Sequence, residues 1–162
     1  MPTPAELEKK LWKALNDHAT AFLGLSNAEH GHGRPMTLIS EGGEHGPLWV
    51  FTTKDNDMVE AAHAGSAAFV HYVSKGHDLW ACVHGNVTIS YDRAVIDRLW
   101  NSHVAAWYEG GKDDPKIALI RFEPDHAEIW EDSSSVVAGV KTALGLSDPK
   151  KDAQGKKATV QL

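Results

Sequence analysis

Two strand-like segments joined by a glycine-rich turn, within residues 34–54, constrain the fold of this chain most. The segments RPMTLIS and LWVFTTK are rich in β-branched, aromatic and other apolar residues, and the turn EGGEHGP between them holds three glycines and a proline. This pattern predicts a β-hairpin. A helix start, DND, follows, so Thr52, Thr53 and Lys54 would offer hydroxyl groups and a cation beside a helix N-terminus. This connection between the second strand and the helix could hold one phosphate group.

The pairing of strands continues further along the chain. AAFVHYV and LWACVHGNVTIS predict a second strand pair, KIALIRF and AEIWED predict a third pair around the turn EPDH, and AFLGLS predicts one more short strand. Apolar residues at helical spacing predict helices at residues 5–17, 58–64, 92–108 and 136–144. Because the helices fall between strand pairs rather than after every strand, we expect a mainly β fold, an antiparallel barrel with peripheral helices.

Composition narrows the classes of protein and of partner. A length of 162 residues suits one domain, which we place at residues 1–146, with a polar C-terminal tail at 147–162. No apolar run approaches the ~18 residues of a membrane span, and a formal net charge of -6 argues against a nucleic-acid binder. A charged N-terminus and a single cysteine, Cys82, favour a cytoplasmic protein without disulfides.

The motifs of the common enzyme classes are missing from the sequence. It contains no GxGxxG, GxxxxGK[ST], HExxH, CxxC or GxSxG pattern. His30, His32 and His45 could gather around a metal ion, but no clear carboxylate or thiol completes such a site, so we expect none. Cys82 lies in an apolar strand and is expected to be a buried small residue rather than a reactive thiol. No residue stands out as a general acid or base.

The order and content of these segments resemble the pyridoxamine 5'-phosphate oxidase-like split β-barrel superfamily, and within it the flavin-binding branch related to general stress protein 26. The resemblance extends from Leu7 to Pro149. It rests on five blocks in the same order: RPMTLIS, LWVFTTKDND, HDLWACVHGNVTISYDRAVIDRLW, AAWYEGGKDDPKIALIRFEPDHAEIW and AGVKTALG. It implies a six- to seven-stranded antiparallel split β-barrel of the FMN-binding type, and a homodimer with FMN at the interface.

By matching position, the resemblance also implies a set of cofactor-binding residues. Main-chain groups of residues 34–37 and the Arg34 guanidinium would line the flavin, while Phe51 and Thr52 would contact its ring system and ribityl chain. Trp80 would pack on the flavin edge and Trp130 would reach it from the neighbouring subunit; core packing is the alternative for either indole. The complete set is Arg34, Pro35, Met36, Thr37, Phe51, Thr52, Thr53, Lys54, Asn56, Trp80 and Trp130.

The phosphate end of this site departs from the pattern of the family. Relatives commonly place a basic residue where this chain has Met58, and the true oxidases also place one where it has Asp57. An acidic residue next to a phosphate lowers affinity. Lys54 could supply the missing charge, with Thr53 and Asn56 donating hydrogen bonds; the alternative is that Lys54 is an ordinary surface lysine.

The segment after Trp130 departs from the pattern as well. Oxidases of vitamin B6 phosphates continue with an Arg-Leu-His segment that grips the vitamin phosphate, whereas this chain has EDSSSVVAG. We therefore expect an FMN-binding general stress protein, a flavin-dependent oxidoreductase of unknown substrate and redox partner, and not a pyridoxamine 5'-phosphate oxidase. A non-catalytic flavin carrier or sensor, and a split barrel that binds haem or a deazaflavin, are the alternatives.

Overall fold

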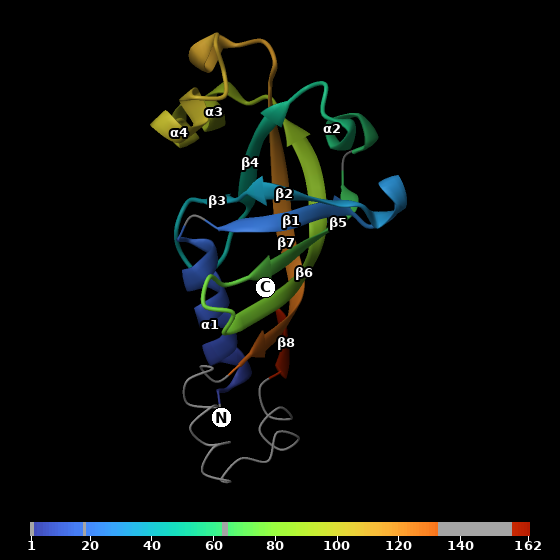
Figure 1. The fold of residues 1–162 in the computed structure, drawn as a ribbon, viewed down its shortest axis with the longest axis vertical. Helices are drawn as coiled ribbons and strands as arrows, with labels where there is room; N and C mark the ends of the chain where they lie inside the picture. Colours follow the sequence, from blue (N-terminus) through green and yellow to red (C-terminus); the bar gives the residue numbers. More distant parts are fainter. Residues whose placement is uncertain (1, 18, 63–64, 133–156) are drawn as a thin grey trace.

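The computed structural model describes residues 2–17, 19–62, 65–132 and 157–162. Its centre is a curled antiparallel sheet, with α-helices and short 3-10 turns around it (Figure 1). The strands are β1 (Thr20–Leu25), β2 (Gly33–Thr37), β3 (Ile39–Ser40), β4 (Leu48–Thr53), β5 (Ser66–Val73), β6 (Leu79–Ser90), β7 (Ile117–Glu131) and β8 (Lys157–Gln161). Their order is β2-β1-β5-β6-β7-β4-β3, and β8 pairs with β7 outside this path. The prediction of a mainly β, antiparallel split-barrel fold is confirmed.

Four α-helices and two 3-10 turns complete the described chain. They are α1 (Pro4–Leu15), α2 (Asp57–Ala61), α3 (Arg93–Leu99), α4 (Ser102–Ala105), η1 (Glu29–Gly31) and η2 (Gly111–Asp113). Helix α1 lies along one end of the sheet, whereas α2, α3 and α4 gather at the other end (Figure 1). No helix in the described part of the chain has the length and apolar character needed to cross a membrane.

Helix α1 begins at a capping box and buries one apolar face. The Thr3 hydroxyl oxygen accepts a hydrogen bond from the Glu6 N–H, the Glu6 carboxylate accepts one from the Thr3 N–H, and Pro4 occupies the start of the helix. The apolar side chains predicted for one face are buried in the main core: Leu7, Leu11, Trp12 and Leu15. The helix therefore closes the interior of the curled sheet at this end.

The first predicted hairpin forms only in part. RPMTLIS divides at Leu38, so that β2 pairs with β1, whereas β3 pairs with β4 at only two positions. Strands β2 and β3 lie at opposite edges of the sheet order, and Leu38 alone connects them. The Leu38 side chain is buried and its N–H binds the Ala19 carbonyl. Because the sheet curls, its two edges meet at this residue (Figure 1).

The third predicted strand pair is wrong, because KIALIRF and AEIWED form the single strand β7. The predicted turn contains Pro124, which has no N–H to donate to a neighbouring strand. Pro124 is tolerated because it lies between the last β7 residue paired with β4, Phe122, and the first paired with β8, His126. The strand therefore continues where its sequence predicts a turn.

A β-bulge marks the same place on the other side of β7. The register with β6 shifts between His84 and Gly85, which lie opposite His126 and Pro124. A Cβ atom on Gly85 would lie 2.0 Å from the Glu123 carbonyl oxygen. Glycine at position 85 is therefore required by the close approach of two backbones.

The helix predicted at residues 92–108 is two helices. Helix α3 ends at Leu99, and Asn101 caps the start of α4, where its side-chain oxygen accepts a hydrogen bond from the Val104 N–H at 2.9 Å. A side chain that caps a new helix within an apolar helical pattern divides that pattern. Periodicity predicted helical structure in this segment, but it missed the break and extended the helix three residues past the end of α4 at Ala105.

The end of the predicted polar tail is part of the sheet. Strand β8 pairs with β7 and buries Ala158 and Val160, whereas its alternate residues are exposed. This alternation is typical of a strand with one buried face. The helix predicted at residues 136–144 lies outside the described residues.

A second apolar cluster lies outside the main core, on the outer side of β4 and β7. Along β4, Leu48 and Val50 point into the main core, whereas Trp49 and Phe51 point outward. Helices α3 and α4 cover these outward side chains through Val95, Ile96, Leu99 and Val104. The two clusters fix the end of β4 where the predicted site residues lie.

Candidate functional site

Arg34 is the charged centre of the predicted site, and it is already paired. Its guanidinium donates to the Glu29 carboxylate from Nη1 to Oε2 at 2.9 Å and from Nη2 to Oε1 at 2.5 Å. Its Nη2 also lies 3.9 Å from Oδ2 of Asp57, at the start of α2. The hydrogen bonds to Glu29 raise the pKa of Arg34, and the same bonds lower the pKa of Glu29. The guanidinium on β2 therefore lies between two carboxylates, one from η1 and one from the start of α2.

Glu29 reaches Arg34 from a loop with unusual backbone geometry. Glu29 has a φ of 52° and His30 a φ of 57°, both in the left-handed region that non-glycine residues seldom adopt. Each such residue costs on the order of 1 kcal/mol. The Glu29 side chain is 17% exposed and that of Arg34 is 23% exposed, so the pair is largely shielded from water. The ion pair therefore helps to hold η1 against β2.

The rest of β2 offers main-chain groups rather than converging side chains. Met36 packs against the main core, while Pro35 and Thr37 are exposed. Strand β2 is at one end of the sheet order, so within the part of the chain that the structure describes only one side of its backbone pairs with a strand, β1. The other side of the β2 backbone could accept or donate hydrogen bonds to a ligand.

At the end of β4, Phe51 and Thr52 contact residues that follow α3 and α4, not Arg34. The Phe51 ring lies edge-on to Trp100 at 6.0 Å and to Tyr108 at 6.4 Å between ring centroids. The Tyr108 hydroxyl donates a hydrogen bond of 2.6 Å to the Thr52 carbonyl. Burial is the main cause that raises the pKa of Tyr108 to about 12, and the nearby Asp114 carboxylate adds to the effect. Tyr108 therefore stays protonated and fixes the backbone at Thr52.

The residues after β4 are engaged in local contacts. The Lys54 ammonium lies 5.1 Å from the ring centroid of Tyr91, a cation-π contact at the surface. The Asn56 side-chain oxygen accepts a hydrogen bond from the Met58 N–H at 2.9 Å and caps α2. The Thr53 carbonyl accepts from the Asn56 N–H at 3.0 Å. The N–H groups of Asn56 and Met58, at the start of α2, are thus already used within the chain.

Trp80 and Trp130 lie directly opposite each other on β6 and β7, far along the sheet from the end of β4. Their pair is next to Leu79 and Glu131, at the end of the β6-β7 ladder opposite to Ser90 and Leu119. Trp80 is 44% exposed and Trp130 is 37% exposed. The single chain therefore does not bring these two indoles to Arg34 or Thr52.

The two tryptophans belong to an exposed apolar surface, which we call the outer sheet face. Residues that pair across neighbouring strands share a face, and the cross-strand pairs place Val73 beside Trp80 and Phe22 beside His71. Four of the six large apolar side chains that are exposed in the described residues lie on it: Phe22, Val73, Trp80 and Trp130. Exposed apolar side chains grouped in this way are typical of an interaction surface.

Histidines and a cysteine fill the middle of the outer sheet face. His84 stacks on His126 with ring centroids 4.8 Å apart, and Cys82 Sγ lies 3.3 Å from Nε2 of His84. The pKa of His71 is lowered mainly by burial and to a smaller extent by His84. The pKa of Cys82 is raised mainly by burial and to a smaller extent by the Glu128 carboxylate. Cys82 is thus half-buried on the outside of the sheet, not in the core as predicted, and its thiol is protonated at neutral pH.

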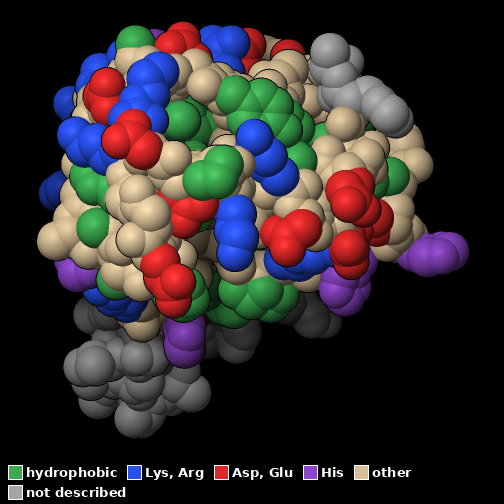
Figure 2. Space-filling model, turned by 90° about the horizontal axis from the view of Figure 1, so that it is seen from above, with side chains coloured by type: hydrophobic (Ala, Val, Ile, Leu, Met, Phe, Trp, Pro, Cys, Tyr) green, Lys and Arg blue, Asp and Glu red, His purple; other side chains and the backbone are tan. Residues whose placement is uncertain are grey.

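The end of the molecule that carries α2, α3 and α4 mixes both signs of charge. Basic side chains lie next to acidic ones around apolar groups across this face (Figure 2). Arg93 pairs with Asp97 at 3.5 Å and also with Asp113, and Arg98 pairs with Glu41. Both arginines of α3 are therefore paired with nearby carboxylates.

The matches to known proteins agree with this architecture. A family model described as pyridoxamine 5'-phosphate oxidase like matches residues 6–152. The chain belongs to this family. General stress protein 26 of Bacillus subtilis (strain 168) is 26% identical over 146 residues, which cover 87% of this chain and 96% of that protein. The pyridoxamine 5'-phosphate oxidase-like chain is thus similar to general stress protein 26 along most of its length.

Two solved structures from Xanthomonas show the same fold. A general stress family protein of Xanthomonas campestris pv. campestris has 52% sequence identity and a TM-score of 0.78, covering 83% of this chain and 93% of that one. The general stress FMN/FAD binding protein of Xanthomonas citri has 50% identity and a TM-score of 0.76, covering 81% and 92%.

Within this pyridoxamine 5'-phosphate oxidase-like chain, Met58 is part of the core. Its side chain is fully buried among apolar residues at the start of α2. A basic side chain would pay a large desolvation cost there. A phosphate near α2 would therefore have to find its positive charge elsewhere, and the Arg34 guanidinium, 3.9 Å from Oδ2 of Asp57 at the start of α2, could supply it.

Sequence reasoning missed Glu29 and Tyr108. Glu29 lies five positions before Arg34, in a linker whose glycines and histidines carry no strand or helix pattern. Tyr108 lies at the end of a predicted helix, where an aromatic residue suggests packing. Only the three-dimensional contacts to Arg34 and to the Thr52 carbonyl show what the two side chains hold.

Proposed function

We propose that this protein binds FMN as a homodimer and uses the flavin as a redox centre. The observation that carries the proposal is the 50% identity, over 92% of its length, to a Xanthomonas citri protein described as a general stress FMN/FAD binding protein. At this level of identity, a shared fold usually keeps the same ligand site. The proposal then depends on whether the residues present suit a flavin nucleotide.

The position of Arg34 suits an anionic, oxygen-rich ligand. Two carboxylate oxygens of Glu29 already lie 2.9 and 2.5 Å from the guanidinium nitrogens. A phosphate or a flavin carbonyl presents the same kind of acceptor, and arginine binds such groups through two nitrogens at once. The side of the β2 backbone that pairs with no strand among the described residues adds neutral hydrogen-bonding groups beside it. Arg34 and β2 together therefore fit a flavin nucleotide better than an uncharged ligand.

The outer sheet face supports the homodimer. Tryptophan and phenylalanine are enriched in protein interfaces, and an exposed apolar face gains free energy when it is covered. Since Trp80 and Trp130 lie at the far end of the β6-β7 ladder from the end of β4, they would serve the site of a partner rather than their own. A second copy packed on this face would complete each site with residues of both subunits.

When bound, FMN would supply the hydride or electron chemistry. The protein groups would bind and orient it: Arg34 by charge, β2 by backbone hydrogen bonds, and Tyr108 by fixing the backbone at Thr52. Asn56 and Lys54 lie on the connection to α2, where a phosphate could reach them. None of these side chains has to exchange a proton with a substrate.

The first experiment is the absorption spectrum of the purified protein, before and after incubation with FMN. Two flavin bands, and a stoichiometry of one FMN per chain in a dimer by sedimentation, are the expected result. A haem spectrum, or a colourless protein that takes up no FMN, would refute the proposal. Steady-state oxidation of NADH or NADPH with an added acceptor would then separate an oxidoreductase from a flavin carrier or sensor.

A second experiment addresses the phosphate. If Lys54 contacts it, Lys54→Ala should weaken FMN binding severalfold at low salt and less at high salt, because exposed charge interactions are screened. Lys112→Ala, which removes an exposed lysine on η2, is the matched control. Equal affinities for Lys54→Ala and the unmodified protein at both salt concentrations would mean that Lys54 is a surface residue.

A further inference from the structure

Three histidines lie together in the middle of the outer sheet face, one on each of the neighbouring strands β5, β6 and β7. Cross-strand pairing places His71 beside Cys82, and His84 beside His126. The rings of His84 and His126 stack with their centroids 4.8 Å apart. On the other side of β5, the exposed Phe22 pairs with His71. A second copy that covers the apolar side chains of this face therefore also covers the three imidazoles.

In a single chain these imidazoles can take up protons from water. All three reach the surface, and those of His84 and His126 are half-buried. Within one chain the pKa of His71 is already lowered, mainly by burial and to a smaller extent by His84. A second copy packed on the face would remove the rings further from water, and burial disfavours the charged form of histidine. Proton uptake therefore favours separate chains over the dimer.

The other charged groups of the face do not offset three imidazolium charges. In the described part of the chain, β1, β2 and β5 pair only uncharged side chains and His71 on this side of the sheet. Strand β7 brings Glu128, and Asp125 with its Oδ2 2.8 Å from Nδ1 of His126; β8 brings Lys157, which pairs with Glu128 at 3.1 Å. One lysine and two carboxylates leave one negative charge, and three protonated histidines would change it to two positive charges. Two identical faces would then repel each other more strongly.

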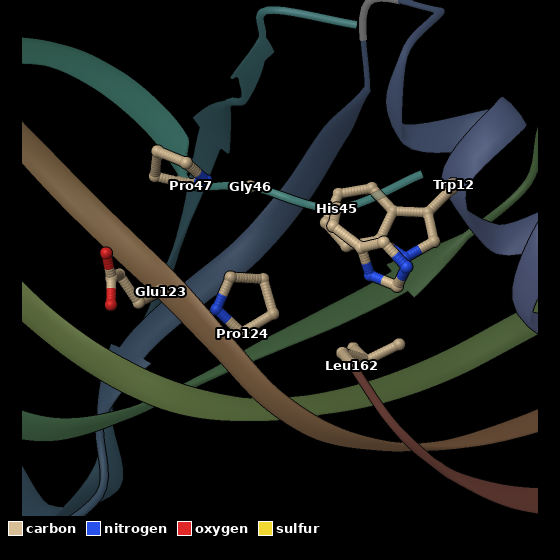
Figure 3. A pocket seen from close by; sticks show the side chains of 7 residues that line it. All are labelled: Trp12, His45, Gly46, Pro47, Glu123, Pro124 and Leu162. Carbon is tan, nitrogen blue, oxygen red and sulfur yellow. The ribbon is translucent and has the colours of Figure 1, made fainter. Parts of the chain in front are cut away.

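The remaining titratable groups near the face lie at its rim or beyond it. The β5-β6 turn, residues 74–78, carries one lysine, one aspartate and His77. Beyond the β-bulge, Arg121 and Glu123 form an ion pair. His45 belongs to a separate cavity, where its ring lies 6.1 Å from that of Trp12 on α1 (Figure 3). Among the described residues, the three central histidines are therefore the groups of this face that change charge near neutral pH.

We propose that the outer sheet face is a pH-sensitive interface: two copies associate through it when His71, His84 and His126 are neutral, and separate when these imidazoles take up protons. This inference rests on the homodimer of the proposed function and adds its regulation. Because an ordinary histidine has a pKa of about 6.5, the change falls between pH about 7.5 and about 5.5. The stability that neutral imidazoles give the dimer is present above this range and is lost as the pH falls through it.

Sedimentation of the protein with excess FMN, at pH about 7.5 and about 5.5, measures the dissociation constant of the dimer. The constant should be at least about tenfold higher at the lower pH, since one pKa unit at one imidazole corresponds to a tenfold change. The circular dichroism spectrum should stay the same, and a return to pH about 7.5 should restore the dimer. An unchanged dissociation constant would overturn this proposal and leave the homodimer standing, whereas a monomer at both pH values would refute both.

Variants identify the groups that take up the protons. His71→Gln and His84→Gln each remove one such group and keep a polar side chain, so each should reduce the rise of the dissociation constant at acid pH, and the double variant should reduce it further. His103→Gln, at an exposed histidine on α4, is the matched control and should keep the full rise. Titration of the FMN phosphate is common to all these proteins. A full rise in both single variants, each folded by circular dichroism, would overturn the proposal.

Discussion

Arg34 donates two parallel hydrogen bonds to the carboxylate of Glu29, so that an internal anion occupies the guanidinium. Hydrogen bonds between charged groups are about twice as strong as neutral ones. Here they also link η1, with its two left-handed residues, to β2. A ligand that needs Arg34 must either share the guanidinium with Glu29 or displace it. Glu29 is therefore placed to set the affinity of the site.

The first prediction concerns Glu29→Gln, which keeps the size of the side chain and removes its charge. If Glu29 competes with FMN for Arg34, this variant should bind FMN about threefold to tenfold more tightly, because a neutral amide is a weaker partner for the guanidinium than a carboxylate. FMN fluorescence titration would measure the change. Asp113→Asn, at a surface ion pair on η2, is the matched control.

Arg34→Ala gives the converse test. Loss of the guanidinium should weaken FMN retention at least about tenfold. Unchanged affinity in a folded protein, as judged by its circular dichroism spectrum, would remove Arg34 from the site. Weaker binding in both Arg34→Ala and Glu29→Gln would mean that Glu29 positions Arg34 for the ligand rather than competing with it.

The second prediction concerns the outer sheet face. Trp130→Ala should raise the dissociation constant of the dimer about tenfold or more, because a tryptophan buried at the centre of an interface contributes strongly to binding. Sedimentation at several protein concentrations would measure it. Trp107→Ala removes a more exposed tryptophan outside this face and should leave the dimer intact. A dimer as stable as the unmodified one in Trp130→Ala would place the interface elsewhere.

The third prediction is a pH dependence. Because burial and His84 lower the pKa of His71 in the folded protein, the unfolded chain binds more protons below the ordinary histidine pKa. Stability should therefore fall as the pH drops below about 6.5. In His71→Phe, which extends the contact with Phe69, the urea midpoint should fall less between pH about 7.5 and about 5.5. The exposed His103, changed to Phe on α4, is the control; an equal loss in both variants would contradict the prediction.

The fourth prediction tests the bulge opposite β7. In Gly85→Ala, the new Cβ would meet the Glu123 carbonyl oxygen at 2.0 Å, which neither backbone can avoid without breaking the register. We expect a loss of about 3 kcal/mol in the free energy of unfolding, measured with urea. Gly76→Ala, where the nearest atoms belong to the flexible Asp78 side chain, should cost no more than about 0.5 kcal/mol.

The sequence predicted most strands because their apolar residues follow the period of a strand, as in AAFVHYV and LWACVHGNVTIS. It failed where tertiary neighbours decide the outcome. Pro124 is a turn signal locally, but in the sheet it fills a gap between two partner strands, β4 and β8. KATVQ is short and lies in a polar tail, so only its pairing with β7 shows that it is a strand.

The candidate site, like the fold, could be predicted from the sequence only in part. Family resemblance directs attention to Arg34, to β2 and to the end of β4. The structure places Arg34 near α2, and it places the end of β4 against the segments that follow α3 and α4. It could not predict that Glu29 takes the guanidinium, because the loop that brings it there has no regular pattern and depends on two left-handed residues. Nor could it predict the Tyr108 contact to Thr52, which requires the break between α3 and α4.

The single-residue link at Leu38 also has a consequence for synthesis on the ribosome. The β1-β2 and β3-β4 pairs are local in sequence and can form as the N-terminal part emerges, but β1 must pair with β5, and β4 with β7, which are made later. Loop closure over such distances is slow. Until β7 emerges, the nascent chain carries the apolar sides of β1 and β4 uncovered, and it is in this interval that chaperones would be needed most.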